Sequence, residues 1–277
     1  SPATSLAAPS TASPAHDRSS TGRRGALTLS VVERMFYPWR SQRFPQTGRT
    51  LLPAGCAASS TRVWTTSTFI RVRVPSASRA LIRNPDHSAE VAGWGARPEV
   101  LDLETATVDD VAAVLRGATA AVFAAGAGPD SGPARKDTVD RGAAVLLAQA
   151  AEQAGVRRFV QISAFGAGSP APADAGETWI AYIDAKTAAE DDLRTRDLDA
   201  TILRPGLLTD DAPTGRIALT EPPLERGSVT RADVAAVVVA LLDAPATAGK
   251  TLMLTEGSVS IVDAVGEIGK STRLNSS

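Results

Sequence analysis

The chain has 277 residues, 43% of them hydrophobic and 21% charged, with a net charge of −1. This length suits one large α/β domain with a substantial core, and the charge balance indicates no nucleic-acid or membrane partner. The single cysteine, Cys56, excludes an intramolecular disulfide framework, and no apolar run approaches the roughly 18 residues of a transmembrane helix, so we expect a cytoplasmic protein.

Residues 1–78 form a leader whose composition differs from the rest of the chain. They contain ten arginines, no lysine and only two acids, Asp17 and Glu33, so the remainder is acidic. The start of the leader lacks apolar periodicity, which predicts disorder. An Arg- and Ser-rich, acid-poor leader is typical of an organellar transit peptide, and an out-of-frame translation of GC-rich DNA would produce the same composition. Both interpretations stay open.

From residue 79 the sequence alternates apolar strands with helices. Strands are predicted over residues 78–83, 98–103, 119–126, 157–163, 199–206 and 250–257. Helices are predicted over residues 107–117, 136–155, 177–197 and 230–245. Thr107 and Thr230 are the expected N-caps of the first and last of these helices, each with an aspartate three residues later. The alternation predicts an α/β fold, a Rossmann-type doubly wound parallel sheet with helices on both faces.

Polar residues at the first two strand ends suit the adenosine half of a dinucleotide. Ligands of such sheets bind at the carboxyl ends of the strands, near the point where strand order reverses. Arg83 ends the strand 78–83, where an arginine can pair with a 2′-phosphate, so it favours NADP over NAD. Asp102 and Leu103 end the next strand, 98–103, and suit an adenine. The plainer interpretations are a surface arginine and a loop aspartate.

The strand 119–126 ends in three small residues, Ala124, Ala125 and Gly126. Small side chains let the backbone approach a flat ligand closely. The G-x-G pattern here is not the dinucleotide fingerprint, because Pro129 and Asp130 stand where the phosphate-binding helix should begin. We expect these residues to contact the ribose and nicotinamide instead.

A hydroxyl group ends the strand 157–163, and a Tyr-x-x-x-Lys pair follows in the next helix. Tyr182 and Lys186 are four residues apart, so they share one helical face. An adjacent ammonium stabilises a phenolate and lowers its pKa, which makes tyrosine a usable acid or base near neutral pH. Ser163 could then hold a substrate oxygen while hydride moves to or from a cofactor. The alternative is a packing tyrosine and a solvated lysine.

Several motifs in this order resemble the atypical short-chain dehydrogenase/reductases, with NmrA-like and NAD(P)-dependent epimerase-like bacterial proteins as the nearest subgroup. The motifs are LIRNPDH, VLDL, VFAAGAG, KDTVDRGA, VRRFVQIS, YIDAK and TILRPG. The resemblance implies a catalytic tetrad in which an aspartate replaces the usual asparagine: Asp140, Ser163, Tyr182 and Lys186. It implies NADP, with NAD possible, along the residues Arg83, Asp102, Leu103, Ala124, Ala125, Gly126, Lys186, Pro205 and Gly206.

The resemblance thus implies an NADP-dependent oxidoreductase or epimerase-like enzyme that acts on a small carbonyl or hydroxyl compound. Two alternatives stay open, a non-catalytic NAD(P)-binding sensor or scaffold and a non-functional product of a defective gene. The sequence departs from the family before Arg79, because the usual strand, G-x-x-G-x-x-G turn and helix are missing or unrecognisable. We therefore expect a sheet without a central strand and weak dinucleotide binding.

The last eight residues of the chain do not look like part of the domain. Residues 270–277 resemble the translation of a common sequencing adapter, and we leave them out of the expected fold. The expected organisation is therefore a leader over 1–78, an NAD(P)-binding domain over 79–269 and an adapter-like tail over 270–277.

Overall fold

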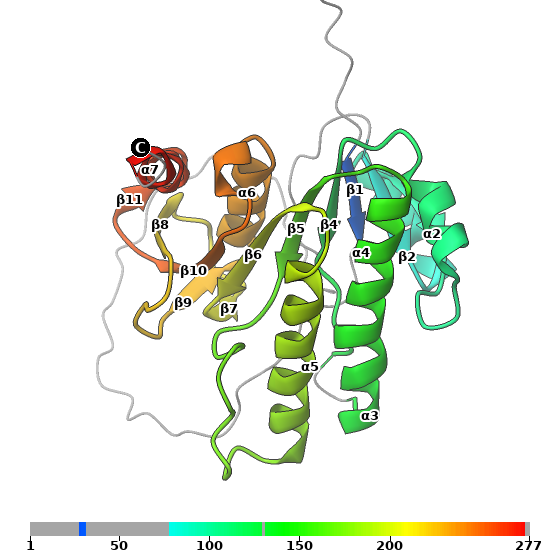
Figure 1. Ribbon diagram of the computed structural model, residues 1–277, viewed down its shortest axis with the longest axis horizontal. Helices are drawn as coiled ribbons and strands as arrows, with labels where there is room; N and C mark the ends of the chain where they lie inside the picture. Colours follow the sequence, from blue (N-terminus) through cyan, green and yellow to red (C-terminus); the bar gives the residue numbers. More distant parts are fainter. Residues whose placement is uncertain (1–27, 32–77, 129–130, 275–277) are drawn as a thin grey trace, which may run out of the picture.

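A computed structural model describes residues 28–31, 78–128 and 131–274 of the chain (Figure 1). Its strands are β1 Thr28–Val31, β2 Arg79–Ile82, β3 Arg97–Val100, β4 Ala120–Phe123, β5 Arg158–Ile162, β6 Asp199–Pro205, β7 Leu207–Thr209, β8 Arg216–Thr220, β9 Ser228–Thr230, β10 Thr251–Glu256 and β11 Val259–Ser260. Its α-helices are α1 Ser88–Gly93, α2 Val108–Leu115, α3 Pro133–Arg135, α4 Ala144–Gln153, α5 Glu177–Arg194, α6 Arg231–Leu242 and α7 Ile261–Leu274. Three further helical segments are η1 Pro85–His87, the π-helix η2 Lys136–Ala143 and η3 Pro245–Thr247.

One nine-stranded sheet organises the described residues, in the order β11-β8-β10-β6-β5-β4-β1-β2-β3. Its strands pair in parallel from β10 to β3, whereas β8 runs antiparallel to β10 and to β11. The strand order reverses between β1 and β4, which is where sheets of this kind bind their ligands. The predicted Rossmann-type fold is confirmed.

Alternate residues of each central strand enter separate hydrophobic cores, because successive side chains of a strand point to opposite faces. In β4, Ala121 and Phe123 pack with residues of α2, α4 and α5, whereas Val122 and the residue after the strand, Ala124, pack with residues of α6 and α7. Figure 1 shows α4 and α5 side by side across one face of the sheet. Both faces are therefore covered, which explains why the strands are continuous apolar runs.

The central position of the sheet is occupied, so the expectation of a missing strand is wrong. Residues Thr28–Val31 of the leader form β1, which pairs in parallel with β2 on one side and with β4 on the other. This strand is only four residues long and alternates polar with apolar residues, so it lacks the continuous apolar run of the other central strands. The rest of the leader, including Cys56 and the position expected for a glycine-rich turn, lies outside the described residues.

Two helical segments differ from their predicted bounds. The helix predicted over 136–155 is preceded by α3 and is itself divided into the π-helix η2 and α4, and the wider turn of η2 carries Asp140. Helix α7 continues through Leu274, so it includes part of the adapter-like tail. The N-caps at Thr107 and Thr230 are confirmed, since each hydroxyl accepts a hydrogen bond from the backbone N–H three residues later. Within the described part of the chain, no helix is long and apolar enough to span a bilayer.

Candidate active site

A cleft opens at the carboxyl ends of β4, β5 and β6, next to the point where the strand order reverses. It collects all four residues of the expected tetrad, which come from η2, the end of β5 and α5. Its lining residues are Ala125, Gly126, Gly128, Lys136, Asp140, Ile162, Ser163, Ala164, Phe165, Trp179, Tyr182, Lys186, Pro205, Gly206, Leu207, Leu208 and Arg226. Of the residues expected at the nicotinamide end, only Ala124 lies outside this lining, because it packs into the core on the α6 side.

An ion pair between Lys186 and Asp140 forms the floor of the cleft. Lys186 Nζ lies 3.2 Å from Asp140 Oδ1, and the two side chains are 5% and 1% exposed. Lys186 Nζ also donates a hydrogen bond of 3.4 Å to the carbonyl oxygen of Ala125, and Asp140 Oδ2 accepts one of 3.2 Å from the backbone N–H of Ala127. These contacts hold the Lys186 ammonium between η2 and the end of β4.

The ring of Tyr182 lies close to two ammonium groups. Nζ of Lys186 and Nζ of Lys136 each lie 5.8 Å from the centroid of the Tyr182 ring. Trp179 contacts the ring from the preceding turn of α5, with the two centroids 5.4 Å apart. Both ammonium groups therefore lie within cation–π distance of the ring.

Ser163 ends β5 inside the cleft and is 3% exposed. Its backbone N–H donates to the carbonyl of Leu203 in β6 at 2.7 Å, which holds the residue at the sheet edge. Its Oγ has no well-aligned hydrogen-bond partner within the described residues, although the hydroxyl is near enough to Glu190 to help lower the pKa of that carboxyl. A buried hydroxyl in this state is suited to a ligand oxygen.

The turn after β6 requires glycine at position 206. A Cβ atom there would overlap the carbonyl oxygen of Gly227, because the backbone N–H of Leu207 donates to that oxygen at 2.9 Å. The Gly206 N–H in turn donates to the Leu254 carbonyl at 2.8 Å. Pro205 and Gly206 therefore line the cleft wall, and Gly206 presents bare backbone there.

A second, smaller hollow lies at the carboxyl ends of β2 and β3. Its lining residues are Leu81, Arg83, Leu101, Asp102, Leu103, Glu104, Val139 and Ala143. Arg83 forms an ion pair of 3.1 Å with Glu104, whose carboxylate also accepts from Arg135 at 2.7 Å. Asp102 Oδ1 accepts from the Glu104 N–H at 3.0 Å, so this carboxylate orders the turn after β3. The hollow combines apolar walls with one arginine and two carboxylates, Asp102 and Glu104.

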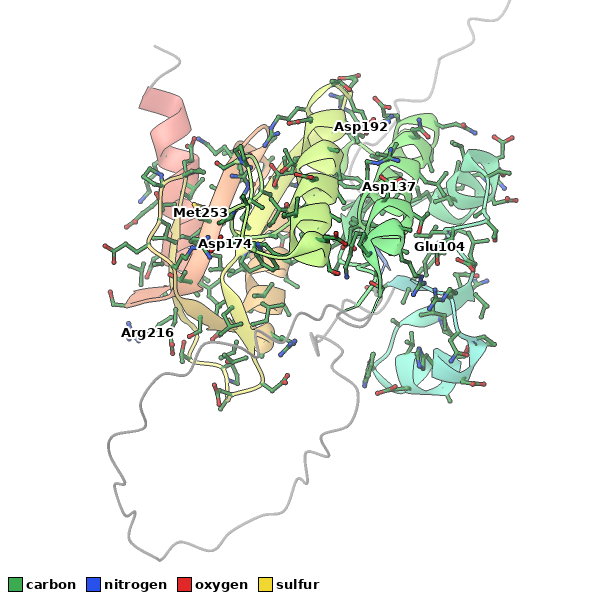
Figure 2. The ribbon with its side chains drawn as sticks, turned by 90° about the horizontal axis from the view of Figure 1, so that it is seen from below. Glu104, Asp137, Asp174, Asp192, Arg216 and Met253 are labelled. Atoms are coloured by element: carbon green, nitrogen blue, oxygen red, sulfur yellow. The ribbon has the colours of Figure 1, made fainter. Side chains whose placement is uncertain are left out.

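Sequence reasoning missed several residues of these two hollows. Figure 2 shows Glu104 beside the helical segment that carries Asp137, and Thr138 of that segment donates to Glu104 at 2.7 Å. Lys136 stands four residues before Asp140, so helical spacing could have placed both on one face. Trp179 stands three residues before Tyr182, which is the same kind of signal. Arg226 lies in an irregular loop, where no periodic pattern identifies it.

Comparisons with known proteins agree with this geometry. Residues 74–245 match the family described as NAD(P)H-binding. A Bacillus subtilis protein named as an uncharacterized sugar epimerase, YhfK, is 33% identical over 190 residues, which cover 69% of this chain and 87% of that protein.

Solved structures give the same result. A Bacillus halodurans protein provisionally named an NAD-dependent epimerase/dehydratase is 32% identical, with a TM-score of 0.63 over 69% of this chain and 87% of its own. The anaerobillin reductase ChuY of Escherichia coli O157:H7 is 30% identical, with a TM-score of 0.53 over 66% of this chain and 86% of its own.

The family match extends over β2 to α6 and takes in both hollows. The resemblance to NmrA-like atypical short-chain dehydrogenase/reductases is thereby confirmed. This chain belongs to the NAD(P)H-binding family of Rossmann-fold proteins.

Proposed function

We propose that this protein is an NADP-dependent oxidoreductase or epimerase-like enzyme that acts on a small carbonyl or hydroxyl compound. The observation that carries the proposal is the convergence of Asp140, Ser163, Tyr182 and Lys186 on one cleft beside the strand-order reversal. Similar proteins named as a sugar epimerase and as a reductase support the same class of chemistry.

The choice of NADP rests on the smaller hollow. Arg83 lines this hollow at the end of β2, and it shares the carboxylate of Glu104 with Arg135. A 2′-phosphate at this position would gain a charge-assisted hydrogen bond from Arg83, whereas the 2′-hydroxyl of NAD would gain less. Asp102 and Leu103 would border the adenine, and Ala125 and Lys186 the nicotinamide ribose.

Each residue of the tetrad has a separate task in this proposal. When bound, the nicotinamide supplies the hydride that reduces a carbonyl carbon, or accepts one from an alcohol. In the reducing direction Tyr182 donates its phenolic proton to the carbonyl oxygen while the hydride goes to the carbonyl carbon, so the carbonyl becomes an alcohol. Lys186 stabilises the phenolate that remains, and Ser163 Oγ donates a hydrogen bond to the same oxygen. Asp140 holds the ammonium in place through the 3.2 Å ion pair.

Substitution of the proposed proton donor tests the mechanism. The full-length protein is incubated with NADPH and a panel of aromatic aldehydes, and nucleotide oxidation is followed by absorbance. We expect Tyr182→Phe to lower kcat by about 10²- to 10⁴-fold, the range typical of a lost general acid, with little change in the Kd for NADP. Equal turnover by the two proteins would remove Tyr182 from the mechanism, and NADP binding without turnover by either would favour the sensor alternative.

A further inference from the structure

The outer walls of the cleft are apolar and aromatic. Beyond the tetrad, the side chains that line it include Ile162, Phe165, Trp179, Pro205, Leu207 and Leu208. Leu207 is 51% exposed, so the apolar wall extends to the surface of the protein. A sugar presents hydroxyl groups on every side and would leave them without partners against such walls. The walls instead favour a flat, apolar body.

The cleft has three cationic residues and one carboxylate among its lining residues. Lys186 pairs with the carboxylate of Asp140, so the charge of that pair is balanced. Lys136 is 1% exposed, and its Nζ donates to the carbonyl oxygen of Gly128 beside the Tyr182 ring. Lys136 therefore lies in the inner part of the cleft, next to the proposed proton donor.

Arg226 supplies the other charge at the mouth of the cleft. It lies in the loop between β8 and β9, next to Gly227, whose carbonyl receives the Leu207 N–H. Its side chain has no hydrogen bond or ion pair with the described residues. A guanidinium in this position can bind a carboxylate through two parallel hydrogen bonds at a site that the substrate must pass.

We propose that the substrate is a flat, largely apolar carbonyl compound that carries an anionic group such as a carboxylate, and that Arg226 binds this group. The inference deepens the proposed function and rests on it, because the carbonyl must lie against Tyr182 and Ser163. The apolar body would lie on Trp179, Phe165 and Leu208. An unsubstituted sugar meets neither requirement.

A binding experiment tests the charge preference without any need for turnover. Quenching of tryptophan fluorescence measures the Kd of naphthoate and of naphthamide, a neutral analogue of the same shape, with NADP at saturation. We expect naphthoate to bind about tenfold or more tightly than naphthamide, because it gains a charge-assisted hydrogen bond. Arg226→Gln should abolish this difference in affinity, and Arg226→Lys should restore part of it. Equal affinities would overturn the proposal. So would a loss of NADP affinity in Arg226→Gln that matches the loss for naphthoate, because the arginine would then serve the nucleotide.

A turnover experiment separates this inference from the proposed function. The full-length protein reduces para-carboxybenzaldehyde and its methyl ester with NADPH, and we expect kcat/KM to favour the acid by about tenfold. Arg226→Gln should remove the preference mainly through KM, whereas Arg97→Ala, at an exposed position on β3, should leave it unchanged. Turnover that depends on Tyr182 without preference for the acid would overturn this inference alone. Preferential naphthoate binding without turnover of either aldehyde would overturn the proposed function alone.

Discussion

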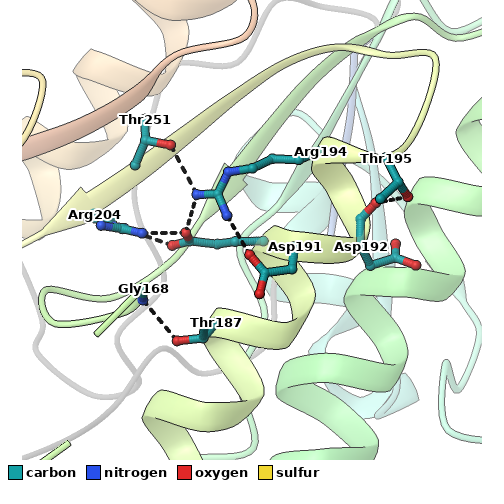
Figure 3. Close-up of polar contacts among 9 residues, drawn as sticks. Gly168, Thr187, Asp191, Asp192, Arg194, Thr195, Arg204 and Thr251 are labelled. Carbon is teal, nitrogen blue, oxygen red and sulfur yellow. Dashed lines mark hydrogen bonds and ion pairs between the residues drawn. The ribbon is translucent and has the colours of Figure 1, made fainter. Parts of the chain in front are cut away.

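Replacement of Glu190 by glutamine should strongly destabilise the fold. The Glu190 side chain is 0% exposed and lies on α5, four residues after Lys186. Figure 3 shows Arg204 and Arg194 converging on one carboxylate from different directions. Arg204 donates from Nε at 2.8 Å and from Nη2 at 2.5 Å, and Arg194 donates from Nη2 at 2.7 Å. The substitution keeps the size of the side chain but removes the charge that balances a buried guanidinium.

The magnitude follows from what remains after the change. Arg204 is 9% exposed and would keep its charge opposite a neutral amide. Removal of one partner of a buried ion pair typically costs about 3–5 kcal/mol of unfolding free energy, and glutamine can still accept one bond, so we expect about 3 kcal/mol. With a urea dependence of roughly 1–3 kcal/mol per molar, the unfolding midpoint would fall by about 1–3 M.

The pH dependence of this loss provides an independent check. Burial alone would raise the pKa of Glu190, but hydrogen bonds from Arg204 and Arg194, the nearby Ser163 hydroxyl and the charge of Arg204 together hold it below its ordinary value. A carboxyl whose pKa is lowered by folding stabilises the protein fully above its unfolded pKa of about 4.3, and that contribution is lost as the pH falls through the folded value. The difference between wild type and Glu190→Gln should therefore be full at neutral pH and shrink below about pH 4.

Urea unfolding followed by circular dichroism measures the effect, with Asp191→Asn as the matched control. Asp191 also pairs with Arg194, at 2.8 Å, but its side chain is 66% exposed, so its loss should cost less than about 1 kcal/mol. Unfolding free energies that agree between the two variants would refute the reasoning about burial.

Two further substitutions test the cofactor side of the site. Gly206→Ala should lower the unfolding free energy by at least about 1 kcal/mol, because the added Cβ would overlap the Gly227 carbonyl and the turn would have to shift. Thermal melting measures this loss, and an unchanged melting midpoint would contradict the prediction. Arg83→Ala should weaken NADP about tenfold or more but NAD much less, by calorimetric titration; equal losses for the two nucleotides would show that Arg83 does not contact the 2′-phosphate.

Most of the sheet could be predicted because its strands are buried on both faces. Continuous apolar runs such as those of β4 and β5 have few other interpretations between two helices. The strands that sequence reasoning missed lack this signal. Strand β1 is short and mixes polar with apolar residues, and β8 lies toward the edge of the sheet with a mixed burial pattern. Their places depend on pairing with strands that are distant in the sequence.

Some residues of the candidate active site could be predicted from the sequence, and others could not. Ser163, Tyr182 and Lys186 could be placed together because strand ends converge at one sheet edge and because residues four apart share a helical face. Arg226 could not be placed, since it comes from an irregular loop whose path depends on the backbone contact between Gly227 and Leu207. Sequence spacing thus predicts residues on regular elements, whereas residues on loops depend on tertiary contacts.

The spacing that identified Tyr182 and Lys186 continues to Glu190, and this links the stability of the fold to the chemistry of the cleft. A carboxylate with no exposure must be paired, and its partner Arg204 comes from β6, directly before the turn at Gly206. The pair therefore joins the helix that carries the proposed proton donor to the strand that leads into the cleft wall. If this link positions Tyr182, Glu190→Gln should lower kcat about tenfold or more at temperatures where the variant is fully folded, because small displacements of reacting groups are costly. A folded Glu190→Gln variant with the kcat of the wild type would limit the pair to a structural role.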